Sequence, residues 1–175
     1  MTSKRAVAVF DTYGHTGRFV VAELVTREWT PILCGRDQGR LEALASVYPE
    51  LELRVVSVDD PESLDRALNC AVATINCAGR FLDTAMPMVK AALHARIHYL
   101  DVASGQRAVL DVFERHADAA RKAGIAALPS MAFYGGLADL LVTAAKDDCR
   151  ASMRSTSASR STAGIYCGYA LDRPV

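Results

Sequence analysis

Strands and helices are predicted to alternate along most of this chain, and this alternation constrains the fold more than any other feature. Residues 6–10 (AVAVF) are apolar without interruption, as expected for a central strand that is covered on both faces. A turn that contains glycine follows, and apolar residues at helical spacing then predict a helix over residues 17–28. A strand followed by a helix, repeated many times, is typical of a parallel sheet with helices on both faces.

The elements after residue 28 continue in the same order. Asp60 and Pro61 are typical of a helix start, because Asp caps a helix and Pro fits its first position. Gly124 is suited to end the helix before it. Strands are predicted at residues 31–34, 53–58, 72–76, 98–100 and 125–128, and helices at 38–48, from 61, from Pro87, at 109–123 and at 136–147.

This order predicts an α/β protein with a doubly wound parallel sheet of about six strands, the three-layer Rossmann fold. We expect this domain to occupy residues 1–148. The segment after it differs, because seven of the fourteen residues from 150 to 163 are Ser or Thr, which is typical of a linker. Residues 165–171 (IYCGYAL) are predicted to form one more strand. We interpret residues 149–175 as a linker and the start of a truncated second domain.

The charge balance argues against several classes of partner. Lys and Arg number 20, and Asp and Glu also number 20, so no whole-molecule field attracts nucleic acid or anionic lipid. The apolar runs are far shorter than the ~20 residues of a membrane span, and the first run is too short for a signal peptide. We expect a cytoplasmic protein that binds neither nucleic acid nor a membrane.

The five cysteines suggest neither a disulfide framework nor a metal site. Their number is odd, and no two of them form a Cys-x-x-Cys pair. His94 and His98 form a His-x-x-x-His pair, but it lacks the Glu of the zinc-protease motif. We therefore expect reduced thiols and no bound metal.

The turn after the first strand has glycines where a dinucleotide-binding turn needs them. Gly14 would let the backbone approach a pyrophosphate, and Gly17 would let the next helix pack closely on the strand. The free N–H groups at the start of that helix would hold the phosphates. A tight turn needs glycine with or without a ligand, so the position between strand and helix carries the prediction. The candidate cofactor-binding residues here are Thr12, Tyr13, Gly14, His15, Thr16 and Gly17.

The residue that ends the second strand indicates which dinucleotide binds. Arg36 lies 22 positions after Gly14, near the ~20 expected for the residue that reads the adenosine ribose. An acid there would bind the 2′-hydroxyl of NAD, whereas an arginine can pair with the 2′-phosphate of NADP and stack on adenine. Asp37 is the argument for NAD, but its side chain should diverge from that of Arg36. The pattern favours NADP over NAD, with a plain surface turn at residues 35–36 as the alternative.

Two further strand ends supply candidates for the same cofactor. Asp59 follows the third strand and could accept a hydrogen bond from the adenine amino group, with capping of the next helix as its competing role. Asn76, Ala78 and Gly79 follow the fourth strand, where the backbone would pass the second ribose of the cofactor.

The fifth strand carries the candidates for catalysis. Tyr99 and Asp101 alternate on one side of it and could line the nicotinamide end, with a structural Tyr–Asp hydrogen bond as the alternative. Arg80 could pair with an anionic substrate or be a solvated loop residue.

These segments resemble the NADP-binding domain of saccharopine dehydrogenase-like proteins, a family that includes the mycobacterial-type trans-acting enoyl reductases. The family shows Tyr-Gly-Ala-Thr-Gly-Tyr-Thr-Gly-Arg at the first turn, Ala-Gly-Arg after the second strand and Asn-x-Ala-Gly-Pro-Phe after the fourth. The corresponding segments are residues 10–18, 34–36 and 76–81. The resemblance, which covers residues 5–145, implies a Rossmann domain that binds NADP. It also implies a second domain for substrate binding and dimerisation, and hence a possible homodimer.

The chain departs from the family pattern at several positions. Asp11 stands in place of the first glycine, so its carboxylate is expected to face the diphosphate with no neutralising partner evident in the turn. Arg80 replaces the family's proline. Ala132 and Tyr134 replace Gly and Asp on either side of Phe133. We expect the second domain to be largely missing.

Two functions fit these residues. The first is the nucleotide-binding domain of a saccharopine dehydrogenase-like, NADP-dependent oxidoreductase that acts on an unidentified small molecule. The alternative is a non-catalytic nucleotide sensor or interaction module on the same fold. Arg36 favours the first function, and Asp11 favours the second. The sequence has no Tyr-x-x-x-Lys pair, P-loop motif or Gly-x-Ser-x-Gly motif, which argues against short-chain dehydrogenase, nucleoside triphosphatase and hydrolase chemistry.

Overall fold

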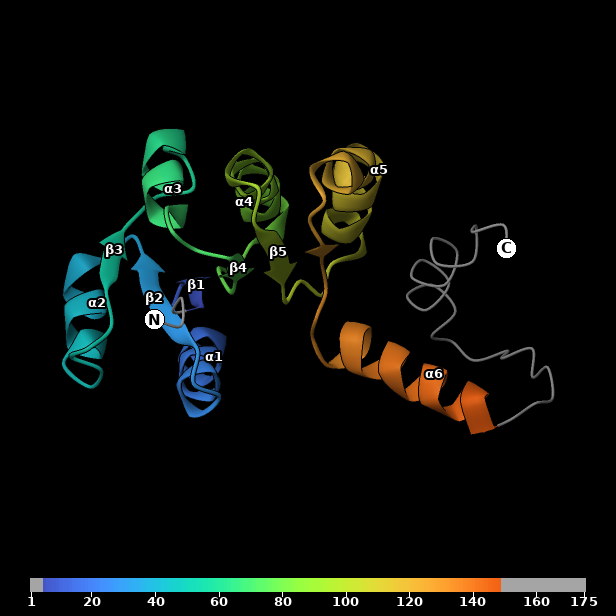
Figure 1. Cartoon of the computed structure of the whole chain (residues 1–175), viewed down its shortest axis with the longest axis horizontal. Coiled ribbons are helices and arrows are strands. Elements are labelled where there is room, and N and C mark those ends of the chain that lie inside the picture. The colour runs from blue at the N-terminus through green and yellow to red at the C-terminus, as the bar shows by residue number, and fades with distance from the viewer. Residues whose placement is uncertain (1–4, 149–175) are drawn as a thin grey trace.

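Six parallel strands form the sheet of the computed structural model, which describes residues 5–148 (Figure 1). Their spatial order is β3-β2-β1-β4-β5-β6, the order of the Rossmann fold, so the predicted fold class is confirmed. The predicted linker and second-domain start, residues 149–175, lies outside the described residues. The strands are β1 (Ala6–Phe10), β2 (Thr30–Gly35), β3 (Leu53–Val55), β4 (Ala73–Asn76), β5 (His98–Asp101) and β6 (Ala127–Leu128).

The first strand lies in the middle of the sheet, where β1 pairs in parallel with β2 on one side and with β4 on the other. Successive side chains of a strand point to opposite faces, so the strand supplies residues to two cores. Ala8 and Val9 are both fully buried, one on each face. This position explains why the run is apolar without alternation.

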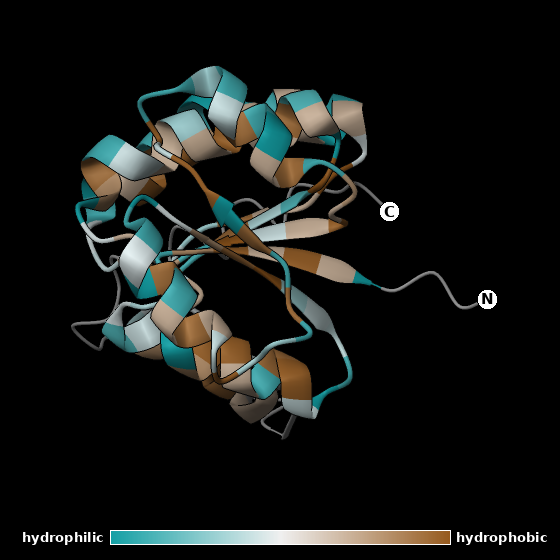
Figure 2. Ribbon diagram, turned by 90° about the vertical axis from the view of Figure 1, so that its left-hand side faces the viewer, coloured by the Kyte–Doolittle hydropathy of each residue, from teal (hydrophilic) through white to brown (hydrophobic). Residues whose placement is uncertain are grey.

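Helices cover both faces of the sheet and complete the three predicted layers (Figure 2). One core includes Val21 and Leu41, and the other includes Met88 and Val112. The first core therefore lies under α1 and α2, and the second under α3, α4 and α5. The helices are α1 (His15–Thr26), α2 (Gln38–Ala45), α3 (Pro61–Leu68), α4 (Phe81–Ala95) and α5 (Gln106–Ala123).

Two predicted helix ends are confirmed by their caps. Asp60 accepts hydrogen bonds from the backbone N–H groups of Glu62 (3.1 Å) and Ser63 (3.2 Å), and Pro61 is the first residue of α3. Gly124 ends α5 with a φ of 70°, a conformation that suits glycine.

The predicted start of α4 at Pro87 is wrong, because Pro87 lies inside the helix, which begins at Phe81. The turn before the proline is held by other contacts. Arg80 O accepts hydrogen bonds from the N–H groups of Asp83 (2.8 Å) and Thr84 (3.2 Å). Arg80 Nε also forms an ion pair with Asp83 at 2.9 Å. These contacts extend the helix for six residues ahead of a residue that cannot donate to the helical ladder.

The predicted helix from residue 136 also begins differently. A π-helical turn, η1 (Phe133–Leu137), comes first, and α6 (Ala138–Asp148) continues from it. A Cβ at Gly135 would overlap the carbonyl oxygen of Ser130, so the wide turn depends on this glycine. Figure 1 shows α6 extending away from the sheet.

None of the helices within residues 5–148 combines the length and hydropathy that a membrane span needs. Over the same range, no three potential ligand side chains come together as a metal site. Cys34 and Cys77 are buried free thiols, and burial raises the pKa of each to about 12, whereas Cys70 is an exposed free thiol.

Candidate functional site

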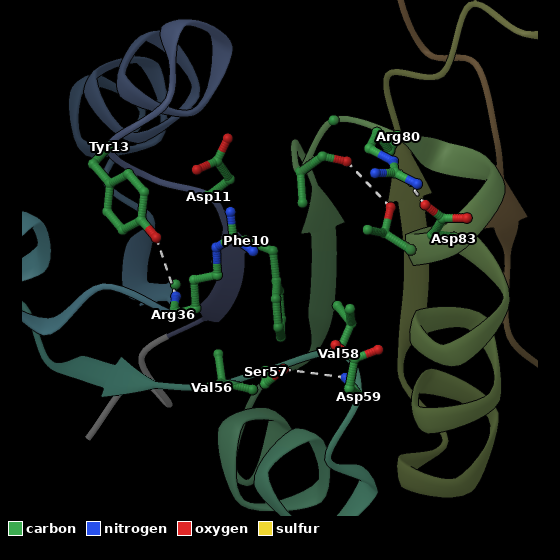
Figure 3. Close-up of a pocket in the computed structure, with 14 residues that line it drawn as sticks. Phe10, Asp11, Tyr13, Arg36, Val56, Ser57, Val58, Asp59, Arg80 and Asp83 are labelled. Carbon is green, nitrogen blue, oxygen red and sulfur yellow. Dashed lines mark hydrogen bonds and ion pairs between the residues drawn. The ribbon is translucent and has the colours of Figure 1, made fainter.

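A cleft of about 720 Å³ opens at the carboxyl ends of the central strands. Its walls are the end of β1, the segments that follow β2 and β3, and the turn between β4 and α4 (Figure 3). Open α/β sheets bind ligands at this edge, where the strand order reverses. The cleft is lined by Phe10, Asp11, Tyr13, Gly35, Arg36, residues 56–59, residues 78–80, Asp83 and Thr84.

The turn between β1 and α1 is shaped by close contact between backbone atoms. Gly14 is the N-cap of α1, and its N–H donates to Asp11 O over 2.9 Å. A Cβ at Gly17 would overlap the Asp11 carbonyl oxygen, so glycine is what lets the helix pack this close. His15 and Thr16 are exposed in the first turn of α1, and no side chain of residues 5–148 caps that turn. Binding of the diphosphate at the start of this helix stays a prediction.

Asp11 takes the backbone conformation that a glycine would favour, with a φ of 58°. Its carboxylate lies against Gly14, because a Cβ on that glycine would overlap it. Burial raises the pKa of Asp11, and the charges of Arg40 and Arg36 oppose this rise. The sequence shows no neutralising partner within the turn, and the structure supplies two from outside it: Arg36 just after β2 and Arg40 in α2.

Tyr13 joins the ends of β1 and β2. Its hydroxyl oxygen accepts hydrogen bonds from the N–H groups of Arg36 and Asp37, both at 3.1 Å. The Arg40 guanidinium stacks 4.3 Å from the centre of the Tyr13 ring. A Cβ at Gly35 would overlap that ring, so the glycine is required by an aromatic contact. Arg36 is thereby fixed at its backbone while its side chain is exposed in the cleft wall.

The acids near the predicted ribose and adenine sites have different roles. Asp37 caps α2 by accepting from Arg40 N at 3.0 Å, which diverts its carboxylate from a ribose. Asp59 lines the cleft, and the cap of α3 is supplied by Asp60 instead. Helix capping, the competing role for Asp59, is therefore wrong, and its contact with adenine stays a prediction.

The turn between β4 and α4 forms the opposite wall. Asn76 is fully buried, and its Oδ1 accepts a hydrogen bond from Ala78 N at 3.0 Å. Asn76 therefore lies behind the turn, and Ala78 and Gly79 line the cleft. Arg80, in a left-handed conformation with a φ of 56°, places an exposed side chain beside Asp83 (Figure 3).

Tyr99 and Asp101 lie in the core, away from the cleft lining. The Tyr99 hydroxyl donates to Asp101 Oδ2 at 2.7 Å, and Asp101 Oδ1 accepts from the N–H groups of Ala103 (2.9 Å) and Ser130 (2.7 Å). Burial and the Asp101 charge raise the pKa of Tyr99, which keeps its phenol protonated. This geometry favours the structural Tyr–Asp hydrogen bond over a catalytic role.

The predicted cofactor-binding residues fall into three groups. In the cleft lining are Tyr13, Arg36, Asp59, Ala78 and Gly79. Beside it, at the start of α1, are Gly14, His15, Thr16 and Gly17. Buried behind it are Thr12, whose hydroxyl donates to Cys34 O, and Asn76. The sequence analysis missed Phe10, Arg40, residues 56–58, Asp83 and Thr84.

The span that contains most of the cleft lining also decides the family. The family model of the saccharopine dehydrogenase NADP binding domain matches residues 13–128, from Tyr13 to the end of β6. The chain belongs to this family. Membership confirms the predicted NADP-binding Rossmann domain and identifies NADP as the cofactor of the family.

Solved structures of several differently named dehydrogenases and reductases have the same fold. Apo saccharopine dehydrogenase (L-Glu forming) from Saccharomyces cerevisiae matches with a TM-score of 0.69 and 17% identity, over 82% of this chain and 31% of that one. A short-chain type dehydrogenase/reductase from Mycobacterium ulcerans matches with a TM-score of 0.61 and 14% identity, over 71% of this chain and 66% of that one. The triphenylmethane reductase of Citrobacter sp., complexed with NADP(H), matches with a TM-score of 0.52 and 20% identity, over 67% of this chain and 46% of that one.

These likenesses establish the fold alone, because identities this low carry no information about function. The chain spans about a third of the length of the saccharopine dehydrogenase that it matches. No curated protein matches the sequence.

Proposed function

We propose that this chain binds NADP(H) in the cleft and serves as the nucleotide-binding part of an oxidoreductase. The observation that carries the proposal is the pair of arginines around Tyr13: Arg36 lines the cleft, and Arg40 stacks on the ring at 4.3 Å. The Arg36 guanidinium in the cleft wall, with the Arg40 guanidinium on the Tyr13 ring beside it, suits a 2′-phosphate, which carries one to two negative charges. Asp37 caps α2, so the acid that would favour NAD is already engaged.

The cofactor in this proposal crosses the cleft from β3 towards β4. Arg36 binds the 2′-phosphate, and Asp59 accepts from the adenine amino group. The exposed start of α1 holds the diphosphate through its backbone N–H groups. The nicotinamide half then lies against Ala78 and Gly79 on the opposite wall.

Bound NADPH supplies the hydride in this proposal, while the chain binds and orients it. The hydride acceptor in this proposal is a small molecule, because a nicotinamide cofactor passes its hydride to a bound substrate.

Fluorescence titrations of the purified chain with NADPH and NADH test the proposal. We expect NADPH to bind more tightly by about 1.5–3 kcal/mol, the value of a charge-assisted hydrogen bond. Arg36→Ala should abolish this preference, and Arg40→Ala should reduce it. Arg121→Ala is the matched control, because Arg121 is exposed on α5 and pairs with Asp118. Equal affinities of the wild type for the two cofactors would contradict the proposal.

We also propose a homodimer, and a cytoplasmic location stays a prediction from the sequence. The support for the homodimer is the run of exposed apolar side chains on η1 and α6, with Phe133 69%, Tyr134 78% and Leu140 63% exposed. Sedimentation velocity should give a dimer for the wild type and a monomer for Leu140→Glu. A monomeric wild type would contradict this assignment.

A further inference from the structure

Thr84 has two roles at once in the first turn of α4: it lines the cleft and it bonds to the turn before the helix. Its Oγ1 donates to Ala78 O at 3.1 Å and accepts from Asn76 Nδ2 at 3.2 Å. Asn76 Oδ1 accepts from Ala78 N at 3.0 Å. Two buried side chains therefore hold both the N–H and the C=O group of Ala78.

Asn76 and Thr84 form a clamp on Ala78 that works through buried side chains. Asn76 is fully buried and Thr84 is 8% exposed, so both work in surroundings where hydrogen bonds are strong and hard to replace by water. Tyr99 extends the clamp into the core, because its hydroxyl oxygen accepts from Asn76 Nδ2 at 3.5 Å. The peptide between Ala78 and Gly79 is therefore held from behind while its other side faces the cleft.

Gly79, the next residue, is not required by the protein itself. A Cβ placed on it would have no atom of the described part of the chain within 4 Å, and its φ is not positive. Gly35, in contrast, is required by the Tyr13 ring, which a Cβ would overlap. Neither packing nor backbone conformation requires a glycine at this position of the cleft wall. The glycine therefore keeps the wall open for a ligand.

The position of the clamp indicates which part of the ligand it meets. Figure 3 shows Arg36 on one side of the cleft and Arg80 and Asp83, which flank Gly79 and Thr84 in the sequence, on the other. If Arg36 binds the 2′-phosphate, the nicotinamide half of an extended dinucleotide reaches the Ala78–Gly79 wall.

We propose that Thr84 and Asn76 are positioning residues that present the Ala78–Gly79 backbone to the nicotinamide-side ribose of NADPH, and that Gly79 gives this ribose its close approach. The inference rests on the proposed function, because it needs NADPH in the cleft. Thr84 acts here through Ala78 and makes no direct bond to the cofactor.

Two ligands and three variants test this inference. NADPH spans the whole cleft, whereas adenosine 2′,5′-bisphosphate occupies only the Arg36 side. Thr84→Val keeps the shape of the side chain and removes its hydroxyl. It should weaken NADPH binding about tenfold, because the released Ala78–Gly79 backbone must then be ordered when the cofactor binds, at about 1–2 kcal/mol for one residue. Thr84→Ser restores the hydroxyl and should recover most of this affinity. Both variants should bind adenosine 2′,5′-bisphosphate as the wild type does.

Gly79→Ala provides a second arm that does not depend on the hydroxyl. It should weaken NADPH binding at least about tenfold by filling the space of the ribose, and it should leave the thermal midpoint unchanged or slightly raised, since alanine restricts the unfolded chain. Gly39→Ala, in α2, is the control for a glycine replacement away from the cleft.

The possible outcomes separate the inference from the function on which it rests. Loss of NADPH affinity in Thr84→Val and Gly79→Ala, with the bisphosphate unaffected and Thr84→Ser rescued, supports the inference. Unchanged NADPH affinity, equal loss of both ligands, or failure of the Ser variant to rescue would overturn it while the proposed function stands. A wild type that binds neither ligand would overturn both.

Discussion

The two turns on either side of the cleft are built by different means. In the turn between β1 and α1, backbone packs on backbone, since Gly17 lies against the Asp11 carbonyl and Asp11 itself has a φ of 58°. In the turn between β4 and α4, buried side chains hold the backbone, since Asn76 and Thr84 bond to both polar groups of Ala78. The first turn depends on a missing side chain, and the second depends on particular side chains.

The difference shows that glycine occurs around the cleft for different physical reasons. Gly17 is required by backbone contact and Gly35 by an aromatic ring, whereas Gly79 has open space where its side chain would be. Substitutions should therefore separate the residues that maintain the fold from those that serve only a ligand.

The largest expected effect is on the turn that packs backbone on backbone. In Gly17→Ala the new Cβ would overlap the carbonyl oxygen of Asp11, so helix α1 must move away from β1. We expect the free energy of unfolding to fall by about 3 kcal/mol, the upper part of the range for overpacking in a dense interior. Chemical denaturation followed by circular dichroism measures this change.

Gly39→Ala is the matched control for Gly17→Ala. Gly39 lies in α2, where a Cβ would meet only Asp37 Oδ1 at an ordinary 3.6 Å. Alanine should stabilise this helix by about 0.5–1 kcal/mol, since it has the higher helix propensity. Equal effects of the two substitutions would mean that backbone contact does not distinguish the first turn.

A smaller loss in the free energy of unfolding is expected when the turn between β4 and α4 loses the Tyr99 hydroxyl behind it. In Tyr99→Phe, Asp101 loses the hydroxyl that donates to it at 2.7 Å, and Asn76 loses an acceptor. A buried group left without its partner costs about 1–3 kcal/mol, so we expect a loss of about 2 kcal/mol in the free energy of unfolding.

The control for Tyr99→Phe is Tyr134→Phe. Tyr134 is 78% exposed, and its replacement should change the free energy of unfolding by less than about 0.5 kcal/mol. If Tyr99→Phe were equally neutral, the hydrogen bonds behind the second turn would not support it, and the contrast between the turns would fail.

The fold could be predicted because its signals are local. The apolar run at residues 6–10 indicates a strand buried on both faces, and Asp60, Pro61 and Gly124 mark helix ends by their own chemistry. Pro87 misled the prediction because the first turn of α4 is held by Arg80, which precedes the helix and bonds to it. Such a contact depends on a left-handed residue that the sequence does not reveal.

The sequence could predict only those site residues that directly follow a strand. Arg36 and Gly79 reach the cleft because each follows a parallel strand, and all these strands end at one edge. Arg40 and Thr84 were missed because they belong to helices, whose rotation on the sheet decides which side chains face the cleft. The Arg40 guanidinium meets a tyrosine 27 residues away, a distance in sequence that no local pattern spans.

The smallest expected effect concerns the charge of the first turn. Asp11→Asn removes the charge and keeps a residue that tolerates a positive φ, whereas Asp11→Gly also removes the backbone strain. Both should tighten NADPH binding severalfold, about 1 kcal/mol for one charge near the diphosphate in a solvated cleft. Removing the carboxylate also frees Arg40 and Arg36, the charges that act on it. Asp118→Asn, an exposed acid on α5, is the control.

The pH dependence of this effect follows from the direction of the pKa shift. Burial raises the pKa of Asp11, so as the pH falls the wild-type carboxyl becomes neutral earlier than a free aspartate would. The wild type should therefore approach the affinity of Asp11→Asn as the pH is lowered, and the two proteins should differ most at high pH. The ratio of the two affinities cancels the titration of the 2′-phosphate, which both proteins meet, and titrations with NADH, which lacks that phosphate, check this directly. A ratio of one at about pH 8 would mean that the arginines already neutralise Asp11, and that the departure from glycine affects the backbone of the first turn and not its ligand.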